Sequence, residues 1–148
     1  EQLADHGVDG VIIPDADLIA LDAMSDTLDR LDLACALLVS PTTPRDRMAA
    51  LVARCRGFVY LLARTGLTGA RSELPDLSAR VEALRACTNL PIAAGFGIST
   101  AAQVRQATQS CDAAIVGSAL VNFMRESEDP AAAAVTMVES LATGIYSS

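Results

Sequence analysis

Three short glycine-bearing turns contain the groups in this sequence that are best suited to bind an anion. They are Thr68-Gly69, Gly95-Phe96-Gly97-Ile98-Ser99 and Gly117-Ser118. Glycine lets a ligand approach the backbone closely, so that N–H groups can donate hydrogen bonds to a phosphate. The residues after Ser118 can begin a short helix, whose dipole favours an anion by about 0.3–1 kcal/mol. One glycine after a strand is usually only a turn, but three such turns in succession predict a phosphate-binding site.

The charged residues argue against a nucleic-acid partner and against chemistry that needs lysine. The 148-residue chain has a net charge of −7, and its 11 basic residues are all arginine and scattered along the sequence. A nucleic-acid surface would need a basic stripe, so we expect no nucleic-acid partner. Without lysine the chain has no Schiff-base nucleophile and no residue to hold pyridoxal phosphate, so we expect no cofactor. Backbone N–H groups can grip a phosphate instead, at roughly 1.5–3 kcal/mol for each charge-assisted hydrogen bond.

The cysteines and the single histidine do not suggest a metal site. Cys35, Cys55, Cys87 and Cys111 lie far apart and form no CxxC pair. We expect them to be small core residues in a reducing cytoplasm, and we expect His6 at the surface. No apolar run approaches the roughly 20 residues that a membrane-spanning helix needs, so we expect a cytoplasmic protein without membrane contact.

Five apolar runs predict the strands that would carry these turns. They are Val11–Pro14, Ala36–Val39, Phe58–Leu62, Pro91–Ala94 and Ala113–Val116. Each run is continuous rather than alternating, as is typical of strands buried on both faces of a parallel sheet. Helical patterns lie between them. Thr43 followed by Pro44 is predicted to start one helix, Ser99 is predicted to cap another, and residues 130–143 predict a final helix.

Strands that alternate with helices predict β/α units within one domain over residues 1–148. Such units could form a doubly wound sheet or part of a barrel. No GxGxxG motif follows any strand, which disfavours a dinucleotide-binding sheet. In a barrel the three glycine turns would share the C-terminal rim, where phosphate sites commonly form. The sequence therefore favours an α/β fold that is a partial (β/α)8 TIM barrel with its N-terminal strands missing from this chain.

Four segments resemble the tryptophan synthase alpha chain family in order and in spacing. They read GVDGVIIPD, FVYLLARTGLTGA, AAGFGIST and AAIVGSALV. The resemblance implies an (β/α)8 barrel that cleaves indole-3-glycerol phosphate to indole and glyceraldehyde 3-phosphate. It also implies an alpha2-beta2 heterotetramer with a beta subunit that carries the pyridoxal phosphate. By this alignment the chain corresponds to about strands 4 to 8, the C-terminal part of the domain.

The resemblance also implies roles for individual residues. It places Gly69, Gly97, Gly117 and Ser118 at the substrate phosphate and Tyr60 and Phe96 in the substrate pocket. The segment from Arg64 to Gly69 would form a lid whose Thr68 meets a catalytic carboxylate.

The chain departs from the family at two places. The family's catalytic Glu and Asp fall before Glu1 in this alignment, so no acidic residue here takes their roles, and the chain alone is expected to be inactive. Where the family reads D-L-P-x-E-E, near the beta-subunit contact, this chain reads Asp15-Ala16-Asp17-Leu18. The loss of the proline at Asp17 and of the acidic pair makes that contact the least supported part of the resemblance.

Two other functions remain open from the residues. One is another phosphate-binding barrel, of the phosphoribosyl isomerase or indole-glycerol-phosphate synthase type. The other is a non-catalytic half-barrel that serves as an interaction module. An E-x-G-x-P-[FY]-S-D-P stretch upstream of Glu1 would favour the lyase.

Overall fold

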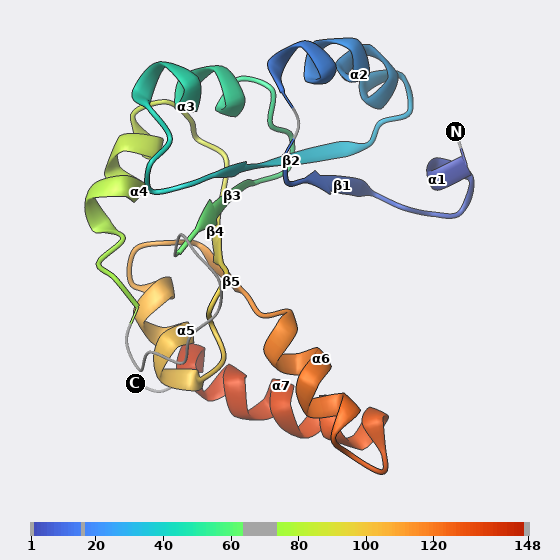
Figure 1. The fold of residues 1–148 in the computed structure, drawn as a ribbon, viewed down its shortest axis with the longest axis vertical. Coiled ribbons are helices and arrows are strands. Elements are labelled where there is room, and N and C mark those ends of the chain that lie inside the picture. The colour runs from blue at the N-terminus through green and yellow to red at the C-terminus, as the bar shows by residue number, and fades with distance from the viewer. Residues whose placement is uncertain (1, 16, 64–73, 147–148) are drawn as a thin grey trace.

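The five predicted strands form one parallel sheet with helices between them (Figure 1). The computed structural model describes residues 2–15, 17–63 and 74–146. The elements are α1 Gln2–Asp5, β1 Gly10–Ile13, α2 Leu18–Arg30, β2 Ala34–Val39, α3 Arg45–Val52, β3 Val59–Leu62, α4 Ser78–Arg85, β4 Ile92–Gly95, α5 Ala101–Thr108, β5 Ala113–Ile115, α6 Ser118–Arg125 and α7 Pro130–Tyr146. In the described residues no helix is long and apolar enough to cross a membrane.

The order of the strands decides between the two predicted architectures. The strands lie side by side as β1-β2-β3-β4-β5, and each neighbouring pair is parallel. A doubly wound sheet reverses its strand order at a switch point, whereas a barrel adds strands in chain order. The observed order is therefore that of a barrel segment, and it confirms the predicted partial TIM barrel.

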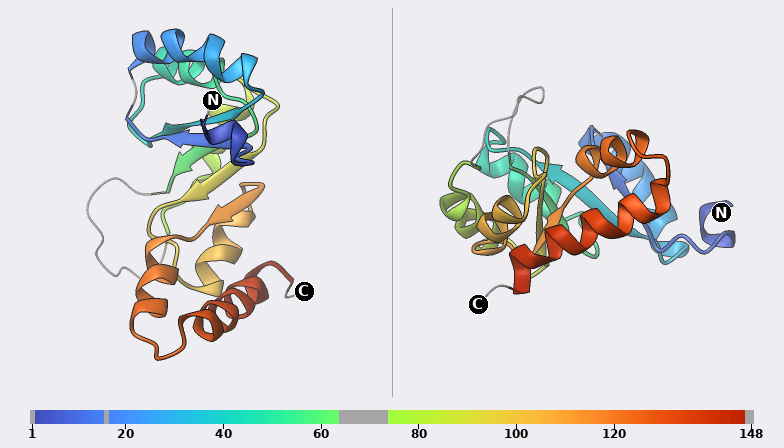
Figure 2. Two further views of the ribbon diagram at one scale, coloured as in Figure 1. Left: turned by 90° about the vertical axis from the view of Figure 1, so that its right-hand side faces the viewer. Right: turned by 90° about the horizontal axis from the view of Figure 1, so that it is seen from below.

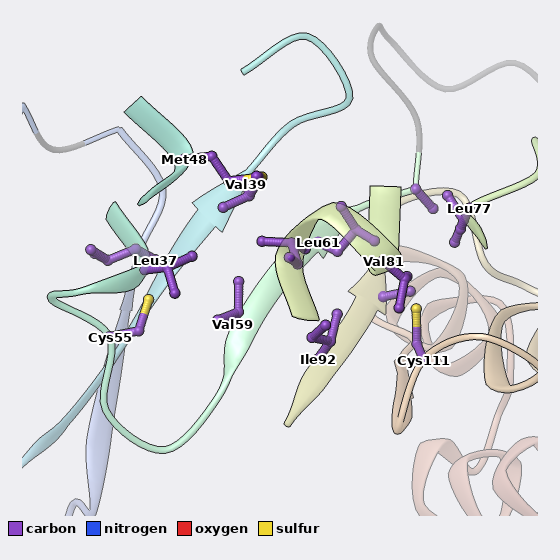
Figure 3. Close-up of a cluster of buried hydrophobic side chains, with 14 of the residues drawn as sticks. Leu37, Val39, Met48, Cys55, Val59, Leu61, Leu77, Val81, Ile92 and Cys111 are labelled. Atoms are coloured by element: carbon purple, nitrogen blue, oxygen red, sulfur yellow. The ribbon is translucent and has the colours of Figure 1, made fainter. Parts of the chain in front are cut away.

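The two faces of the sheet differ in how well they are covered. One face packs its alternate residues against the helices, and these include Leu37, Val39, Val59, Leu61 and Ile92, all nearly inaccessible to solvent (Figure 3). Helix residues from α2 to α5 join the same cluster, namely Leu21, Met48, Leu51, Val52, Val81, Leu84, Val104 and Ala107. The strand residues between them point to the other face, where Ile12 is 48% exposed.

The predicted caps of two helices need correction, and the predicted burial of the cysteines is confirmed in part. Helix α3 begins at Arg45, and Thr43 does not cap it, because the Thr43 hydroxyl accepts a hydrogen bond from the Ser40 N–H at 2.9 Å. The cap of α5 is Thr100 rather than Ser99, since the Thr100 side chain accepts from the Gln103 N–H. Both errors are shifts of a boundary within a run of hydroxyl residues. Three of the four cysteines are buried as expected, whereas Cys87 is exposed.

An ion pair at the amino ends of the strands connects α4 to the sheet. The Asp112 carboxylate accepts a hydrogen bond from the Ile92 N–H at 2.7 Å and another from the Arg85 guanidinium. These two donors, the Ile92 N–H first, hold the pKa of Asp112 below its usual range. The charged form is thus stabilised in the folded state, and its contribution is present above the unfolded pKa of about 3.9 and lost as the pH falls through the lowered native value.

Replacing Asp112 should therefore destabilise the fold in a pH-dependent way. We expect Asp112→Ala to lower the free energy of unfolding by about 1 kcal/mol at pH 7, because the pair is partly exposed. The loss should shrink toward zero well below pH 4. Asp112→Asn keeps an acceptor for Ile92 and should cost less at pH 7. Urea unfolding followed by circular dichroism at pH 7 and pH 3 measures both, and an equal loss at the two pH values would contradict the assignment.

Candidate functional site

The register of the sheet brings the predicted site residues to one edge. Leu62 of β3 pairs with Gly95 of β4, and Gly95 pairs in turn with Ile115 of β5. These three residues form a row at the carboxyl ends of the strands, which we call the carboxyl edge. Gly97 and Gly117 each lie two residues beyond this row. The β4 turn (residues 95–99) and the β5 turn (Gly117-Ser118) therefore leave the sheet side by side, as the sequence predicted.

Tyr60 lies against the base of the β4 turn. A Cβ at Gly95 would lie 2.5 Å from Cζ and 2.7 Å from Cε1 of Tyr60, and closer still to its hydroxyl oxygen. The aromatic ring thus occupies the space that any side chain at position 95 would need. Tyr60 also makes an edge contact with Phe96, with ring centroids 6.1 Å apart. The two residues predicted to line the pocket are together, and the glycine between them permits the arrangement.

The β4 turn has an unusual backbone conformation at two successive residues. Phe96 has a φ of +71° and Gly97 a φ of +82°. Glycine adopts this left-handed region freely, whereas an L side chain pays about 1–2 kcal/mol for it. The Phe96 side chain is 54% exposed despite this cost. Such outliers cluster at functional sites, where the surrounding structure holds them in place.

The β4 turn is joined to helix α5 by hydroxyl and amide groups. The Ser99 N–H donates to the Gln103 side-chain oxygen at 2.8 Å, and the Ser99 hydroxyl donates to the same atom at 3.1 Å. Gln103 itself is buried, with 4% exposure. These bonds join the β4 turn to the first turn of α5.

The β5 turn is open to a ligand. A Cβ at Gly117 would meet nothing within 4 Å, and both Gly117 and Ser118 are exposed. Ser118 is the first residue of α6, and the first N–H groups of a helix have no acceptor within it. Such a helix start, with its partial positive charge, suits an anion.

The Tyr60 hydroxyl contributes a neutral polar group near the same edge. Burial raises the pKa of Tyr60 above its ordinary value. The hydroxyl therefore stays protonated at neutral pH and can donate a hydrogen bond to an oxygen of a ligand.

The remaining predicted site residues lie outside the described part of the chain. These are Arg64, Thr68 and Gly69. The described residues on either side of that segment are held by the same β/α unit. The Ala63 N–H donates to the Gly95 carbonyl at 2.8 Å, and the backbone of Leu74 exchanges two hydrogen bonds with the Gln106 side chain of α5. Gln106 carries no local sequence signal, because its partner is 32 residues away.

Asp17 has a local structural role. Its carboxylate accepts a hydrogen bond from the Ala20 N–H at 2.7 Å and caps the start of α2. The residue that stands where the family has proline therefore begins a helix. The neighbouring Ile19 is 83% exposed.

A hollow elsewhere in the molecule lacks the features of a site. It lies between α3 and α4 and is lined by residues that include Arg45, Met48, Glu82 and Cys87. These helices belong to the outer layer, away from the turns that follow β4 and β5 (Figure 1). The carboxyl edge is therefore the candidate site.

The order of the strands and the alternation with helices define a class of protein, the (β/α)8 TIM barrels, of which this chain forms a segment. Comparison with known proteins gives the family. A family model described as tryptophan synthase alpha chain matches residues 1–146, and the chain belongs to that family. This membership disfavours the phosphoribosyl isomerase and indole-glycerol-phosphate synthase alternatives.

Individual relatives agree with the family model. The chain is 44% identical over 126 residues to the tryptophan synthase alpha chain of a Synechococcus strain, covering 84% of this chain and 47% of the relative. It is 38% identical over 147 residues to that of Phenylobacterium zucineum, covering 96% and 53%. A solved structure of Mycobacterium tuberculosis tryptophan synthase superposes with a TM-score of 0.84 at 33% identity, over 97% of this chain and 54% of that one. The chain thus spans about half the length of these relatives.

The close approach of Tyr60 to Gly95 makes a testable prediction. Gly95→Ala should lower the free energy of unfolding by about 1–3 kcal/mol, since overpacking displaces the ring. In the Gly95→Ala background, Tyr60→Leu should recover part of this loss. Tyr60→Phe should recover less, because the ring carbons also lie too close. Thermal and urea unfolding of the parent, the three single variants and the two double variants measures the coupling, and purely additive losses would show that the two residues do not compete for space.

The backbone of Phe96 makes a second prediction. Phe96→Gly should be more stable than Phe96→Ala by about 1 kcal/mol, because only glycine adopts a positive φ without cost. Ala102, exposed within α5, provides the matched control. There Ala102→Gly should destabilise by about 1 kcal/mol, the opposite preference. If alanine is also the more stable residue at position 96, the left-handed conformation is wrong.

Proposed function

We propose that this chain is the phosphate-binding part of a lyase that cleaves indole-3-glycerol phosphate to indole and glyceraldehyde 3-phosphate in tryptophan biosynthesis. The observation that carries the proposal is the register row Leu62-Gly95-Ile115, which gathers the glycine turns at one edge. Family membership supplies the reaction. The relatives are about twice as long, so the activity belongs to a complete barrel.

The residues of this chain would bind and orient the substrate. In this proposal the backbone N–H groups of Gly97, Gly117 and Ser118 and the Ser118 hydroxyl hold the phosphate. Phe96 and Tyr60 lie beside the rest of the ligand and shield it from water. Binding energy from the phosphate, which is remote from the bond that breaks, then holds the reacting carbons in position.

The chemical step needs two carboxyl groups. A carboxylic acid protonates the indole ring at the carbon that carries the glycerol phosphate chain, and that carbon–carbon bond then breaks by a retro-aldol step. A carboxylate orients the ring or accepts the proton released from the substrate hydroxyl. We propose that both groups come from the part of the barrel outside these 148 residues, in agreement with the family alignment.

The segment from Arg64 to Gly69 would cover the bound substrate. The resemblance supports this role, with Gly69 at the phosphate and Thr68 near a catalytic carboxylate. The hydrogen bonds of Ala63 and Leu74 support it too, since they tie both flanks to the β/α unit that carries Gly97.

We further propose a beta-subunit partner in an alpha2-beta2 heterotetramer, and a cytoplasmic location. The family membership supports this partner, and the solved relative from Mycobacterium tuberculosis is described as tryptophan synthase. The pyridoxal phosphate would belong to the partner, because this chain has no lysine to hold it. Contact through the start of α2 would involve Asp17 and the exposed Ile19, which differ from the family's proline and acidic pair.

A joined barrel tests the proposed function. The N-terminal half of the Synechococcus relative is fused to this chain, and indole release from indole-3-glycerol phosphate is followed for the fusion and for the chain alone. We expect activity from the fusion and none from the chain alone, because only the fusion has the acid and the base. Indole release by the chain alone would show that its own residues perform the chemistry.

A variant of the β5 turn tests the phosphate site within that fusion. Gly117→Asp should raise KM at least 100-fold, since a carboxylate about 4 Å from the phosphate repels it by several kcal/mol. Gly117→Ala is the control, because a Cβ there meets nothing within 4 Å. It should retain the fold and show a smaller change in KM. Equal KM values for Gly117→Asp and the parent fusion would place the phosphate elsewhere.

A further inference from the structure

We propose that Gly144, in the last turn of α7, is a positioning residue for the phosphate site. Its close contact with the start of α5 sets the place of α7, and α7 in turn sets the place of α6 and of the β5 turn. This inference rests on the proposed phosphate site, and it adds a residue outside that site.

The contact between Gly144 and α5 leaves no room for a side chain. A Cβ at Gly144 would lie 3.0 Å from the carbonyl carbon of Ala101 and 3.0 Å from Cβ of Val104, and closer still to the Ala101 carbonyl oxygen. Two of these atoms belong to the backbone of α5 and cannot rotate away. Gly144 is also the one buried residue of α7. An ordinary contact would require the helices to separate by about 1 Å.

Helix α5 is the fixed partner in this contact. Its Val104 and Ala107 are buried in the core cluster with 3% and 0% exposure. Its Gln103 is bonded to Ser99 of the β4 turn. Helix α7 has only the partly buried Leu141 against that core. A side chain at position 144 would therefore displace α7 rather than α5.

Helix α6 depends on α7 for its position. None of its residues is buried, and its main packing partner among the described elements is α7. Figure 2 shows α7 running from α6 at one end to α5 at the other. A shift of α7 therefore moves α6 and, with it, Ser118 at its start. Val116 holds the start of the β5 turn against the core, so the shift would act from the α6 side and displace Ser118 relative to the β4 turn, which is bonded to α5.

This displacement should be visible in phosphate binding. A misplacement of about 1 Å can cost up to 100-fold where several groups must converge on one ligand. Alanine is the better helix former, so the helical preference alone would make Gly144→Ala stabilising. A loss of phosphate affinity therefore comes from the contact with Ala101 and not from the helix itself.

Inorganic phosphate is the probe for the test. It is titrated into the ¹⁵N-labelled chain, and the amide shifts of Gly97, Gly117 and Ser118 give a Kd for both turns. We expect Gly144→Ala to raise this Kd at least tenfold. Ser140→Ala, exposed on the same helix, should leave it unchanged. Asp112→Ala, which weakens the fold at the opposite edge, should also leave it unchanged, so that destabilisation alone is separated from positioning.

Each outcome decides between the proposals. If the unsubstituted chain shows no phosphate-dependent shifts, the proposed phosphate site fails and this inference fails with it. If that chain binds phosphate and Gly144→Ala binds it equally well, the inference alone is overturned. If Gly144→Ala does not fold, Leu141→Ala loosens the packing of α7 against the core without a clash. It should raise the Kd about threefold, and an unchanged Kd would overturn the inference.

Discussion

The hydrogen-bond register between β3, β4 and β5 is the constraint on which the rest of the site depends. Because the strands are parallel, their carboxyl ends lie at one edge, and the pairing of Leu62 with Gly95 and of Gly95 with Ile115 brings those ends level. The segments that follow these three strands therefore begin next to one another at this edge. A shift of one residue in any strand would exchange its two faces and bury the wrong side chains. The core that fixes the register therefore also fixes where the turns meet.

The two faces of the sheet differ in the side chains that they carry. The face toward the helices is filled by branched residues such as Val39, Val59 and Ile92, which pack tightly in a dry layer. On the other face Tyr60 pairs with Ala93 of β4, and its ring lies against Gly95. Small residues there make room for one aromatic ring near the carboxyl edge. The space for the Tyr60 ring on this face thus depends on Gly95 having no side chain.

Sequence reasoning predicts this fold well, because each strand is a continuous apolar run and the segments after the last three strands contain glycine. The partial barrel and the five strands follow from those patterns, and the structure confirms them. The pairing of Gly95 with Ile115 starts the turns of Gly97 and Gly117 at one edge, and their role at a phosphate stays a prediction. The features that sequence reasoning does not predict depend on contacts between residues far apart in the sequence. The role of Gly95 requires the register with Tyr60, and the bonds of Gln106 to Leu74 require the packing of α5. The cap at Thr100 was missed for a local reason, since Ser99 offers the same hydroxyl one residue earlier.

Three of the four ion pairs of the described structure lie near the amino ends of the strands, opposite the candidate site. Arg56 pairs with Asp29 and Asp32, and Arg85 pairs with Asp112, in segments that lead into the strands. The fourth pair, Arg54 with Asp22, joins the end of α3 to α2. The carboxyl edge presents backbone amides, hydroxyls and aromatic rings instead. Substitutions at these ion pairs can therefore change stability without touching the residues of the candidate site. Because the two groups of residues are separate, stability and the candidate site can change independently during evolution.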